Sequence, residues 1–250
     1  MLPTWLNTIT TQLCHKGINL FGIVSGESYS TYLDGCQSII VFANGGTELW
    51  DSFINDITQR PQNLSKHEHP FDDFVHRLIQ EADPNPPSTR RWIRCADTEE
   101  TFIDMRPLAQ NAGIGTHSHM GMLIHPEYGL WVGLRGILLT TEYIPPSSQL
   151  SANPCSTCIE KPCISSCVGN AVTKMGWNIQ LCAETHTTSQ KCSIQCASRL
   201  ACPIGIKHKH SPLQHMYHSN RHEGRKELSH RLKIEDTKEG ENLQWKNWTH

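Results

Sequence analysis

The sequence lacks the features that mark two common classes of protein. Lys and Arg total 22 and Asp and Glu total 24, so the net charge at pH 7 is only -2. A general nucleic-acid binder usually carries a basic excess, and we therefore expect nucleic acid not to be a partner. No stretch approaches the roughly 18 uninterrupted apolar residues of a membrane span. The most apolar segment, residues 121–139, is broken by His125, Glu127 and Arg135.

The N-terminus also lacks a targeting signal. Its first residues, MLPTWLNTITTQL, have neither the basic start nor the long apolar stretch of a signal peptide. We therefore expect a soluble, cytoplasmic protein with no membrane partner. In that reducing compartment, clustered cysteines are more often metal ligands than disulfides.

Cysteine is the residue type that the sequence concentrates in one place. Cys14, Cys36 and Cys95 are scattered, which is typical of ordinary packing, but eight of the 11 cysteines lie between residues 155 and 202. This clustering indicates local chemistry. The eight are Cys155, Cys158, Cys163, Cys167, Cys182, Cys192, Cys196 and Cys202.

The spacing of the first four cysteines, C-x2-C-x4-C-x3-C, is close to that of an iron–sulfur protein. A bacterial two-cluster ferredoxin uses C-x2-C-x2-C-x3-C-P, and its fourth cysteine ligates the other cluster. Two features depart from that pattern, namely the two extra residues in the second gap and Val168 where proline is expected. Cys202 does have Pro203 directly after it.

Eight thiolates are the number that two [4Fe–4S] clusters need. The ferredoxin rule, applied to this spacing, divides them into a first set of Cys155, Cys158, Cys163 and Cys202 and a second set of Cys167, Cys182, Cys192 and Cys196. Two zinc ions, each held by four cysteines, would satisfy the same count. Zinc sites usually pair separate C-x2-C knuckles, so the single run of four cysteines favours iron–sulfur clusters over zinc.

The pattern before the cysteines predicts a mixed α/β or α+β domain over residues 1–146. Apolar stretches predict strands near 18–24, 38–42 and 91–97, and helical spacing predicts helices over 4–16, 49–57 and 72–81. Residues 121–124 and 130–140 are expected to form a strand pair around the turn HPEYG. The break at PPSSQLSANP (145–154) predicts a second domain over 150–222, followed by a polar, frayed tail over 223–250.

Two family resemblances rest on these motifs. The order of the cysteines, with Cys182 alone between two groups, resembles the C-terminal module of epoxyqueuosine reductases and reductive dehalogenases. The segment MGMLIHPEYGLWVGLRGILLTTEYIPP (120–146) is similar to one in the cobalamin-processing decyanase family, and AGIG (112–115) resembles the Ala-Gly-Leu-Gly stretch of the reductases. The chain also resembles small ferredoxin-like bacterial proteins. These likenesses cover about residues 100–205, and the first hundred residues match in element order alone.

The resemblance implies a nitroreductase-like α/β domain followed by a ferredoxin-like module whose two [4Fe–4S] clusters serve a cobalamin. It implies that His125, Tyr128 and Arg135 line the cofactor pocket. Asp104 is the acid nearest to the position of the reductases' proton donor, although its spacing to Ala112 is shorter. From the residues alone, His125 could instead stabilise its own turn, Arg135 could pair with an acid on the sheet, and Asp104 could cap a helix.

Three functions remain open from the sequence. The first is an oxidoreductase that passes electrons to cobalamin or another cofactor, with a redox partner protein as donor and a small molecule or corrinoid as acceptor. The second is a ferredoxin-like electron carrier without catalysis of its own. The third is a zinc-stabilised binding module without redox chemistry.

Overall fold

A computed structural model describes residues 1–95 and 103–235 of the chain and gives a mixed α/β fold. Its centre is a four-stranded antiparallel sheet in the order β1-β2-β6-β3. The strands are β1 (Leu20–Ser25), β2 (Ser38–Gly45), β6 (Val132–Thr140) and β3 (Arg90–Arg94). The predicted strands in residues 18–42 are present, and the predicted strand over 91–97 ends at Arg94, with residues 96 and 97 outside the described residues.

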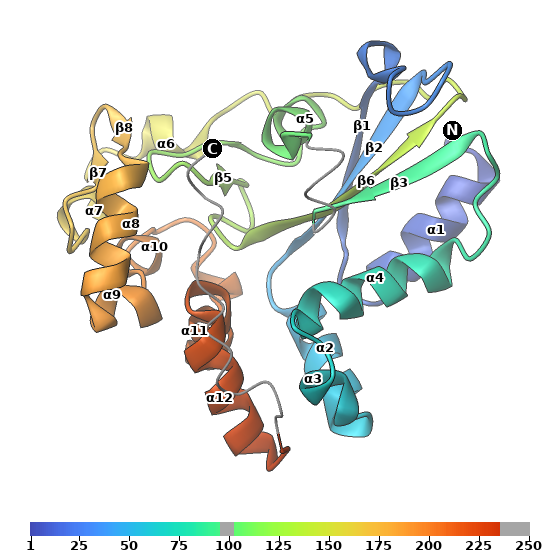
Figure 1. Ribbon diagram of the computed structural model, residues 1–250. Helices are drawn as coiled ribbons and strands as arrows, with labels where there is room; N and C mark the ends of the chain where they lie inside the picture. The colour runs from blue at the N-terminus through green and yellow to red at the C-terminus, as the bar shows by residue number, and fades with distance from the viewer. Residues whose placement is uncertain (96–102, 236–250) are drawn as a thin grey trace.

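Both faces of the sheet are covered, and the covering follows the alternation of side chains along each strand. Ile40 and Phe42 of β2 pack with α1 (Thr4–Cys14), α2 (Glu48–Gln59) and α4 (Pro70–Ala82). Ile39 and Val41 face the other way and pack with α5 (Met105–Asn111). Figure 1 shows α1 and α4 against one side of the sheet and α5 near the other. Every residue of β2 is therefore buried.

The cysteine-rich segment folds into short helices and one small hairpin beside this sheet (Figure 1). A small core of Met120, Ile124, Leu130 and Val172 has five of the eight clustered cysteines packed against it. Residues 120–130 thus belong to the packing of the cysteine segment. The elements are α6 (Pro154–Thr157), α7 (Pro162–Ser165), β7 (Val172–Thr173), β8 (Gly176–Trp177), α8 (Ile179–Thr188), α9 (Gln190–Ile194), α10 (Ala197–Leu200) and η2 (Ile206–His208).

The last described part of the chain forms two helices, and the second of them covers residues 223–232, which the sequence predicted to belong to a polar, frayed tail. These are α11 (Pro212–Ser219) and α12 (Arg221–Leu232), separated at Asn220, whose side chain accepts a hydrogen bond from the Glu223 N–H and so starts α12. Tyr217 and Leu228 are buried in the core of α2 and α4. After the cysteine segment the chain therefore packs again with α2 and α4, and the predicted division into two domains stays a prediction. Residues 236–250 lie outside the described part.

The expected strand pair around HPEYG does not form. Leu123–Ile124 (β5) pairs with Thr116–His117 (β4), and β6 lies between β2 and β3 in the central sheet. The apolar side chains of β6 are buried beside both neighbouring strands, β2 and β3. This burial outweighs the expected short-range pairing with residues 121–124. The small remaining elements are η1 (Glu27–Tyr29) and α3 (Gln62–Ser65). Within residues 1–95 and 103–235, no helix has the length and apolar character to cross a membrane.

Candidate functional site

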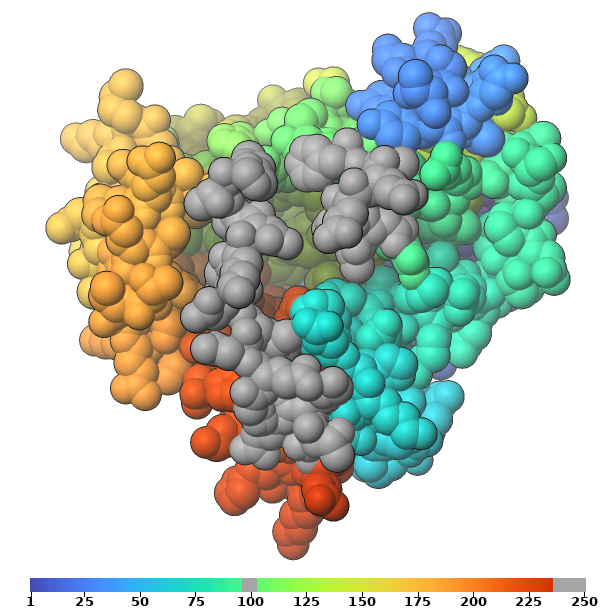
Figure 2. Space-filling model, viewed as in Figure 1, coloured from blue at the N-terminus to red at the C-terminus, as the bar shows by residue number. Residues whose placement is uncertain are grey.

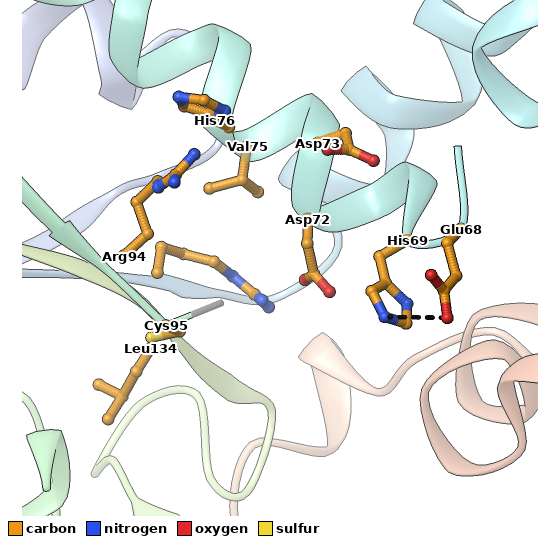
Figure 3. A pocket seen from close by; sticks show the side chains of 10 residues that line it. Glu68, His69, Asp72, Asp73, Val75, His76, Arg94, Cys95 and Leu134 are labelled. Carbon is orange, nitrogen blue, oxygen red and sulfur yellow. Dashed lines mark ion pairs between the residues drawn. The ribbon is translucent and has the colours of Figure 1, made fainter. Parts of the chain in front are cut away.

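A cavity of about 280 Å³, here called the sheet cavity, lies between α4 and the central sheet. Figure 3 shows Asp72 and His76 on the α4 side and Arg94, Cys95 and Leu134 on the side of β3 and β6. The space is near the lower end of the range for small-molecule sites. Its lining residues are Glu68, His69, Asp72, Asp73, Val75, His76, Arg94, Cys95, Leu134 and Arg135.

Arg135 projects from β6 into the sheet cavity and is held there by three neighbours. Its Nε donates to Asn44 Oδ1 at 2.7 Å, and its guanidinium carbon lies 4.9 Å from the centre of the Phe71 ring. Gly133 leaves the space for its Nη2, because a Cβ there would come within 2.2 Å of that nitrogen. Burial lowers the pKa of Arg135, so its environment disfavours the charge that it carries.

The acids on the helix side of the sheet cavity already have basic partners. Asp72 pairs with Arg221 of α12 at 3.2 Å, and Asp73 lies 3.1 Å from His67 Nδ1. Glu68 Oε1 lies 3.9 Å from His69 Nε2. Burial and the nearby Arg221 lower the pKa of His69, which keeps its imidazole neutral at pH 7. Of these three acids, Asp72 therefore has a permanently charged partner, whereas the neutral His69 does not offset the charge of Glu68.

Four of the eight clustered cysteines surround a second, smaller cavity. They are Cys155, Cys158, Cys163 and Cys202, and Ile124 and Ile204 supply apolar parts of the lining. Burial raises the pKa of Cys202, and charge on Cys155, Cys163 and Cys158 raises it further. The four cysteines of the first set predicted from the sequence thus line one cavity. Their role as metal ligands stays a prediction.

The other four cysteines are electrostatic neighbours of one another. Burial raises the pKa of Cys192, and charges on Cys196, Cys182 and Cys167 add to this. Cys167 differs from the rest. Burial raises its pKa, but hydrogen bonds outweigh burial and lower the net value, among them one at 3.2 Å from the Ala171 N–H to its Sγ. This group coincides with the second set predicted from the sequence.

The local sequence starts a helix beside most of these cysteines. Asn153 caps α6 by accepting from the Cys155 N–H at 2.9 Å, and Ser189 caps α9 by accepting from the Cys192 N–H. Lys161 has a φ of 43° and begins α7. Its ammonium donates to the carbonyl oxygens of Cys155 at 3.0 Å and Cys158 at 2.8 Å. Lys161 is one of the residues in the enlarged gap of the C-x2-C-x4-C-x3-C run.

A buried group of basic and aromatic side chains, here called the histidine cluster, connects the cysteine segment to the sheet. Its members are Trp131, Arg199, His210, His215 and His218. The Arg199 guanidinium lies 4.6 Å from the Trp131 ring centre, and the His210 ring lies 4.8 Å from Trp131 and 5.6 Å from His218. Burial lowers the pKa of Arg199 to about 10 and that of His215 to about 4.

The histidine cluster contacts the second set of cysteines through His215. The backbone N–H of Cys196 donates to His215 Nε2 at 3.0 Å, so a neutral His215 carries its proton on Nδ1. Charge on Cys196 raises the pKa of Arg199, in opposition to burial. Within the described residues, the His215 Nδ1, the Trp131 Nε1 and the Arg199 Nε are buried without a hydrogen-bond partner. The positive charge of Arg199 and the unpaired nitrogens of Arg199 and His215 therefore lie beside Cys196.

The remaining predicted site residues lie outside both cavities. Asp104 caps α5 and bonds the backbone N–H and the Nε of Arg106, both at 3.1 Å. The Arg106 hydrogen bond lowers the pKa of Asp104, so the carboxylate is ionised at neutral pH and holds no proton to donate. Asp104 therefore has a structural role in the described chain, and its predicted catalytic role gains no support from geometry.

His125 and Tyr128 lie where the central sheet meets the cysteine segment. His125 Nδ1 accepts from the backbone N–H groups of Glu127 and Tyr128 at 3.1 and 3.2 Å, which stabilises its own turn. The Tyr128 ring lies against Gly45 and 4.4 Å from the His208 ring. Of the three residues predicted to bind a cofactor, Arg135 alone lines one of the two cavities described above. The cofactor-binding role of all three stays a prediction.

Sequence reasoning missed several residues of these sites. Cys95, expected to be ordinary packing, lines the sheet cavity. Asn44 and Arg221, which hold Arg135 and Asp72, carried no motif at all. Lys161 could have been found, because it lies in the gap that departs from the ferredoxin pattern. Among residues 1–95 and 103–235, no three His, Cys, Asp or Glu side chains converge as they would around a single metal ion.

No protein-family model matches this chain. One curated relative is the epoxyqueuosine reductase of Synechococcus sp. (strain RCC307), which is 33% identical over 104 residues. That match spans 42% of this chain and 30% of the relative, so the likeness in sequence covers less than a third of the reductase's length.

Solved structures of related folds cover far more of the chain. The epoxyqueuosine reductase of Streptococcus thermophilus has a TM-score of 0.52 at 17% identity, over 82% of this chain and 67% of that one. The B12-trafficking protein CblC of C. elegans has a TM-score of 0.54 at 14% identity, over 97% of both chains. A reductive dehalogenase with a B12-dependent mechanism has a TM-score of 0.51 at 11% identity, over 89% of this chain and 36% of that one.

One further neighbour corrects an expectation about partners. An epoxyqueuosine reductase of similar fold, with a TM-score of 0.50 at 15% identity, was solved with the stem loop of a modified tRNA. The small net charge of this chain therefore does not exclude a nucleic-acid substrate. The resemblance read from the cysteine order and from residues 112–146 is confirmed, because the same three kinds of protein recur here: epoxyqueuosine reductases, the B12-trafficking protein and reductive dehalogenases.

Proposed function

We propose that this protein is an iron–sulfur reductase. In this proposal the eight cysteines of residues 155–202 hold two [4Fe–4S] clusters, and the electrons serve a reduction at the central sheet. The observation that carries the proposal is the division of the eight thiols into two groups of four: one lines a cavity, and in the other, charge on Cys196, Cys182 and Cys167 raises the pKa of Cys192. The relatives named as reductases and B12 proteins support the reductase class.

The donor set and its surroundings fit such clusters. Each group of four thiols supplies the cysteine ligands that one [4Fe–4S] cluster takes, and bound clusters would supply one-electron transfer. The hydrogen bond from Ala171 to Cys167 Sγ is of the kind that stabilises a ligating thiolate. Lys161 holds the carbonyls of Cys155 and Cys158 and so fixes the loop that carries two thiols of the first set.

In this account Arg199 and His215 position the second set of cysteines. Arg199 donates from Nη2 to the carbonyl of Leu130 at 2.8 Å, which ties α10 to the segment just before β6. His215 accepts from the Cys196 N–H and fixes the start of α10. If Cys196 held a cluster, the buried charge of Arg199 beside it would favour the more negative, reduced state of that cluster.

The reaction partners follow from the proposed clusters. A one-electron donor protein would deliver electrons at the surface of the cysteine segment. The acceptor would be a small molecule, a corrinoid or a modified nucleoside of the kind suggested by the neighbour solved with a tRNA stem loop. Cobalamin is the proposed cofactor because B12 proteins recur among the neighbours. The second candidate function is that of an electron carrier, in which the protein would pass electrons on without catalysis of its own.

Metal content and a corrinoid titration test the proposal and separate the candidates. Anaerobically purified protein should contain about eight irons per chain and bleach in the visible range on addition of dithionite. A colourless protein with zinc alone would contradict it and favour the zinc-stabilised module. Addition of cob(II)alamin under reducing conditions should convert its spectrum to the base-off form. An iron-loaded protein without that change would act as an electron carrier or use another cofactor.

A further inference from the structure

Among the described residues that line the sheet cavity, Arg135 is a cationic group whose position is fixed by its neighbours but whose charge has no carboxylate partner. Arg135 bonds Asn44 through Nε, and among residues 1–95 and 103–235 no carboxylate lies within 4.0 Å of its guanidinium nitrogens. An unpaired charge in a partly buried place costs free energy unless a ligand compensates it. The Nε contact leaves the terminal Nη nitrogens available for such a ligand.

The geometry around Arg135 is that of a fixed guanidinium. The Phe71 ring supports one face, Asn44 holds the Nε edge, and the missing side chain of Gly133 makes room for Nη2. A guanidinium held in this way loses little freedom when it binds a second group. The planar fork of its terminal nitrogens matches the two oxygens of a carboxylate or a phosphate.

The opposite wall does not compete for Arg135. Asp72, the nearest acid in electrostatic terms, is held by Arg221, and Asp73 is held by His67. His69 lies beside Arg221, and burial keeps it neutral. An anionic group that entered the cavity would therefore meet Arg135 on the sheet side, and on the helix side the acid that acts on Arg135 most, Asp72, is paired with Arg221.

We infer that the sheet cavity binds a small molecule, or part of a larger one, through a carboxylate or phosphate group on Arg135. The inference rests on the proposed function in one respect only, which is that the electron acceptor binds at the sheet cavity. It adds the chemical class of the group that is recognised, and it assigns Asn44, Phe71 and Gly133 as positioning residues of the guanidinium. A volume of about 280 Å³ accommodates such a group together with a ring or a short chain.

Anion titration of the full-length, anaerobically purified protein tests this inference. Inorganic phosphate and acetate are titrated separately by calorimetry at constant ionic strength, with chloride as the balancing anion. One of the two should bind at one site per chain, and Arg135→Gln should weaken that binding by about tenfold or more. Tighter binding of phosphate assigns a phosphate-bearing ligand, and tighter binding of acetate assigns a carboxylate. Failure of both anions to bind to the unchanged protein would overturn the inference.

Three variants keep the test informative if Arg135→Gln fails to fold. Arg135→Lys keeps the charge without the fork, and Gly133→Ala keeps Arg135 but crowds its Nη2. Both should weaken binding while leaving the iron content and the electron paramagnetic resonance signals unchanged. Arg231→Gln is the matched control, because Arg231 is exposed and pairs with Glu227 on the surface of α12. Equal affinities in all variants would contradict the role of Arg135, whereas loss of iron in the unchanged protein would count against the proposed function instead.

Discussion

At the scale of single residues, Lys161 lies in the longer second gap of the cysteine run and gives that gap a structural role. Its φ of 43° is a left-handed conformation that costs a residue with a side chain about 1 kcal/mol. The conformation directs the ammonium back to the carbonyls of Cys155 and Cys158. A strained residue persists where its surroundings compensate for the strain, and two hydrogen bonds to the loop that it closes provide that compensation.

Replacing Lys161 with Met should therefore loosen the first set of cysteines and leave the second intact. We expect iron to be lost to a chelator several times faster from one cluster than from the other, because the loop of Cys155 and Cys158 loses its two hydrogen bonds. Iron release, followed by absorbance, measures this. Glu160→Gln is the control, since the exposed Glu160 lies in the same gap. Identical release from the two clusters in Lys161→Met would argue against the role of Lys161.

Asp104 can be tested as a helix cap separately from its predicted role as a proton donor. Asp104→Ala should lower the free energy of unfolding by about 1 kcal/mol, because the Arg106 N–H loses its acceptor. Asp104→Asn keeps an acceptor oxygen, so its stability should remain close to that of the original protein. Urea unfolding measures both. If Asp104→Asn retained stability but abolished reduction, the carboxylate would have a catalytic role that the described structure does not support.

At the scale of secondary-structure elements, α12 holds one wall of the sheet cavity. Arg225 is 2% exposed and donates to the carbonyl oxygens of Leu64, His67 and Glu68. Arg221 in the same helix pairs with Asp72. Both contacts lie beside residues that line the cavity (Figure 2 shows α12 at the lower end of the molecule, in red). The helix therefore supports the shape of the site without reaching into it.

Loss of Arg225 should destabilise the protein and open the cavity. Arg225→Met keeps most of the side-chain volume but removes the donor to the buried carbonyl of Leu64 and to the part-buried carbonyls of His67 and Glu68, and we expect about 3 kcal/mol less free energy of unfolding. Lys226→Met, an exposed neighbour on the same helix, should change stability by less than about 0.5 kcal/mol. Denaturant unfolding compares the two. Equal stability of the two variants would show that α12 does not depend on the Arg225 contacts.

Elements with a regular pattern were predictable from the sequence, and those determined by distant partners were not. Ile39 to Phe42 alternate between two covered faces, and Leu49, Phe53 and Ile57 recur along one face of α2, so local periodicity was enough. β6 was assigned to the wrong pairing because its partners β2 and β3 are far away in sequence. α12 carries almost no amphipathic pattern, since its contact with the core is made by Leu228 and by the buried Arg225.

The two parts of the candidate site also differ in how far they could be predicted from the sequence. The two sets of cysteines proposed from spacing follow from a local rule, because ligands of one cluster come from a short run and one distant residue, and their role as ligands stays a prediction. The sheet cavity could not be predicted, since Arg135, Asp72 and Cys95 come from three separate segments. Their contact exists only after the sheet and α4 have packed.

At the scale of the whole molecule, buried histidines should make stability depend on pH. Burial lowers the pKa of His210 and of His218, and Arg199 and Arg135 act in the same direction on both. His215 also faces both rings, and Arg221 faces His218. These groups stay neutral in the folded chain at pH values where the unfolded chain, with a histidine pKa of about 6.5, binds protons.

The sign of the effect follows from proton binding. Above pH 7 neither state protonates these rings, so stability is constant in this respect. Below about pH 6.5 the unfolded state gains protons that the folded state does not, and stability falls by up to about 1.4 kcal/mol per pH unit for each such histidine. Urea unfolding at pH 7.5, 6.0 and 5.0 should show this loss, and His210→Phe should reduce its slope. His230→Gln, at an exposed position, should not; equal slopes in both variants would exclude His210 as a cause.

The central claim is that the eight thiolates form two sets of four. Cys167, the last cysteine of the first run, belongs with Cys182, Cys192 and Cys196, and Cys202, the last cysteine of the later group, belongs with Cys155, Cys158 and Cys163. The most direct measurement is electron paramagnetic resonance of the reduced protein, with iron counted per chain, for four single Cys→Ser variants. Cys202→Ser should lose the same cluster signal as Cys155→Ser, and Cys167→Ser the same signal as Cys192→Ser, each keeping about half of the roughly eight irons. Pairing of Cys167 with Cys155, or the absence of iron from the unchanged protein, would contradict the account.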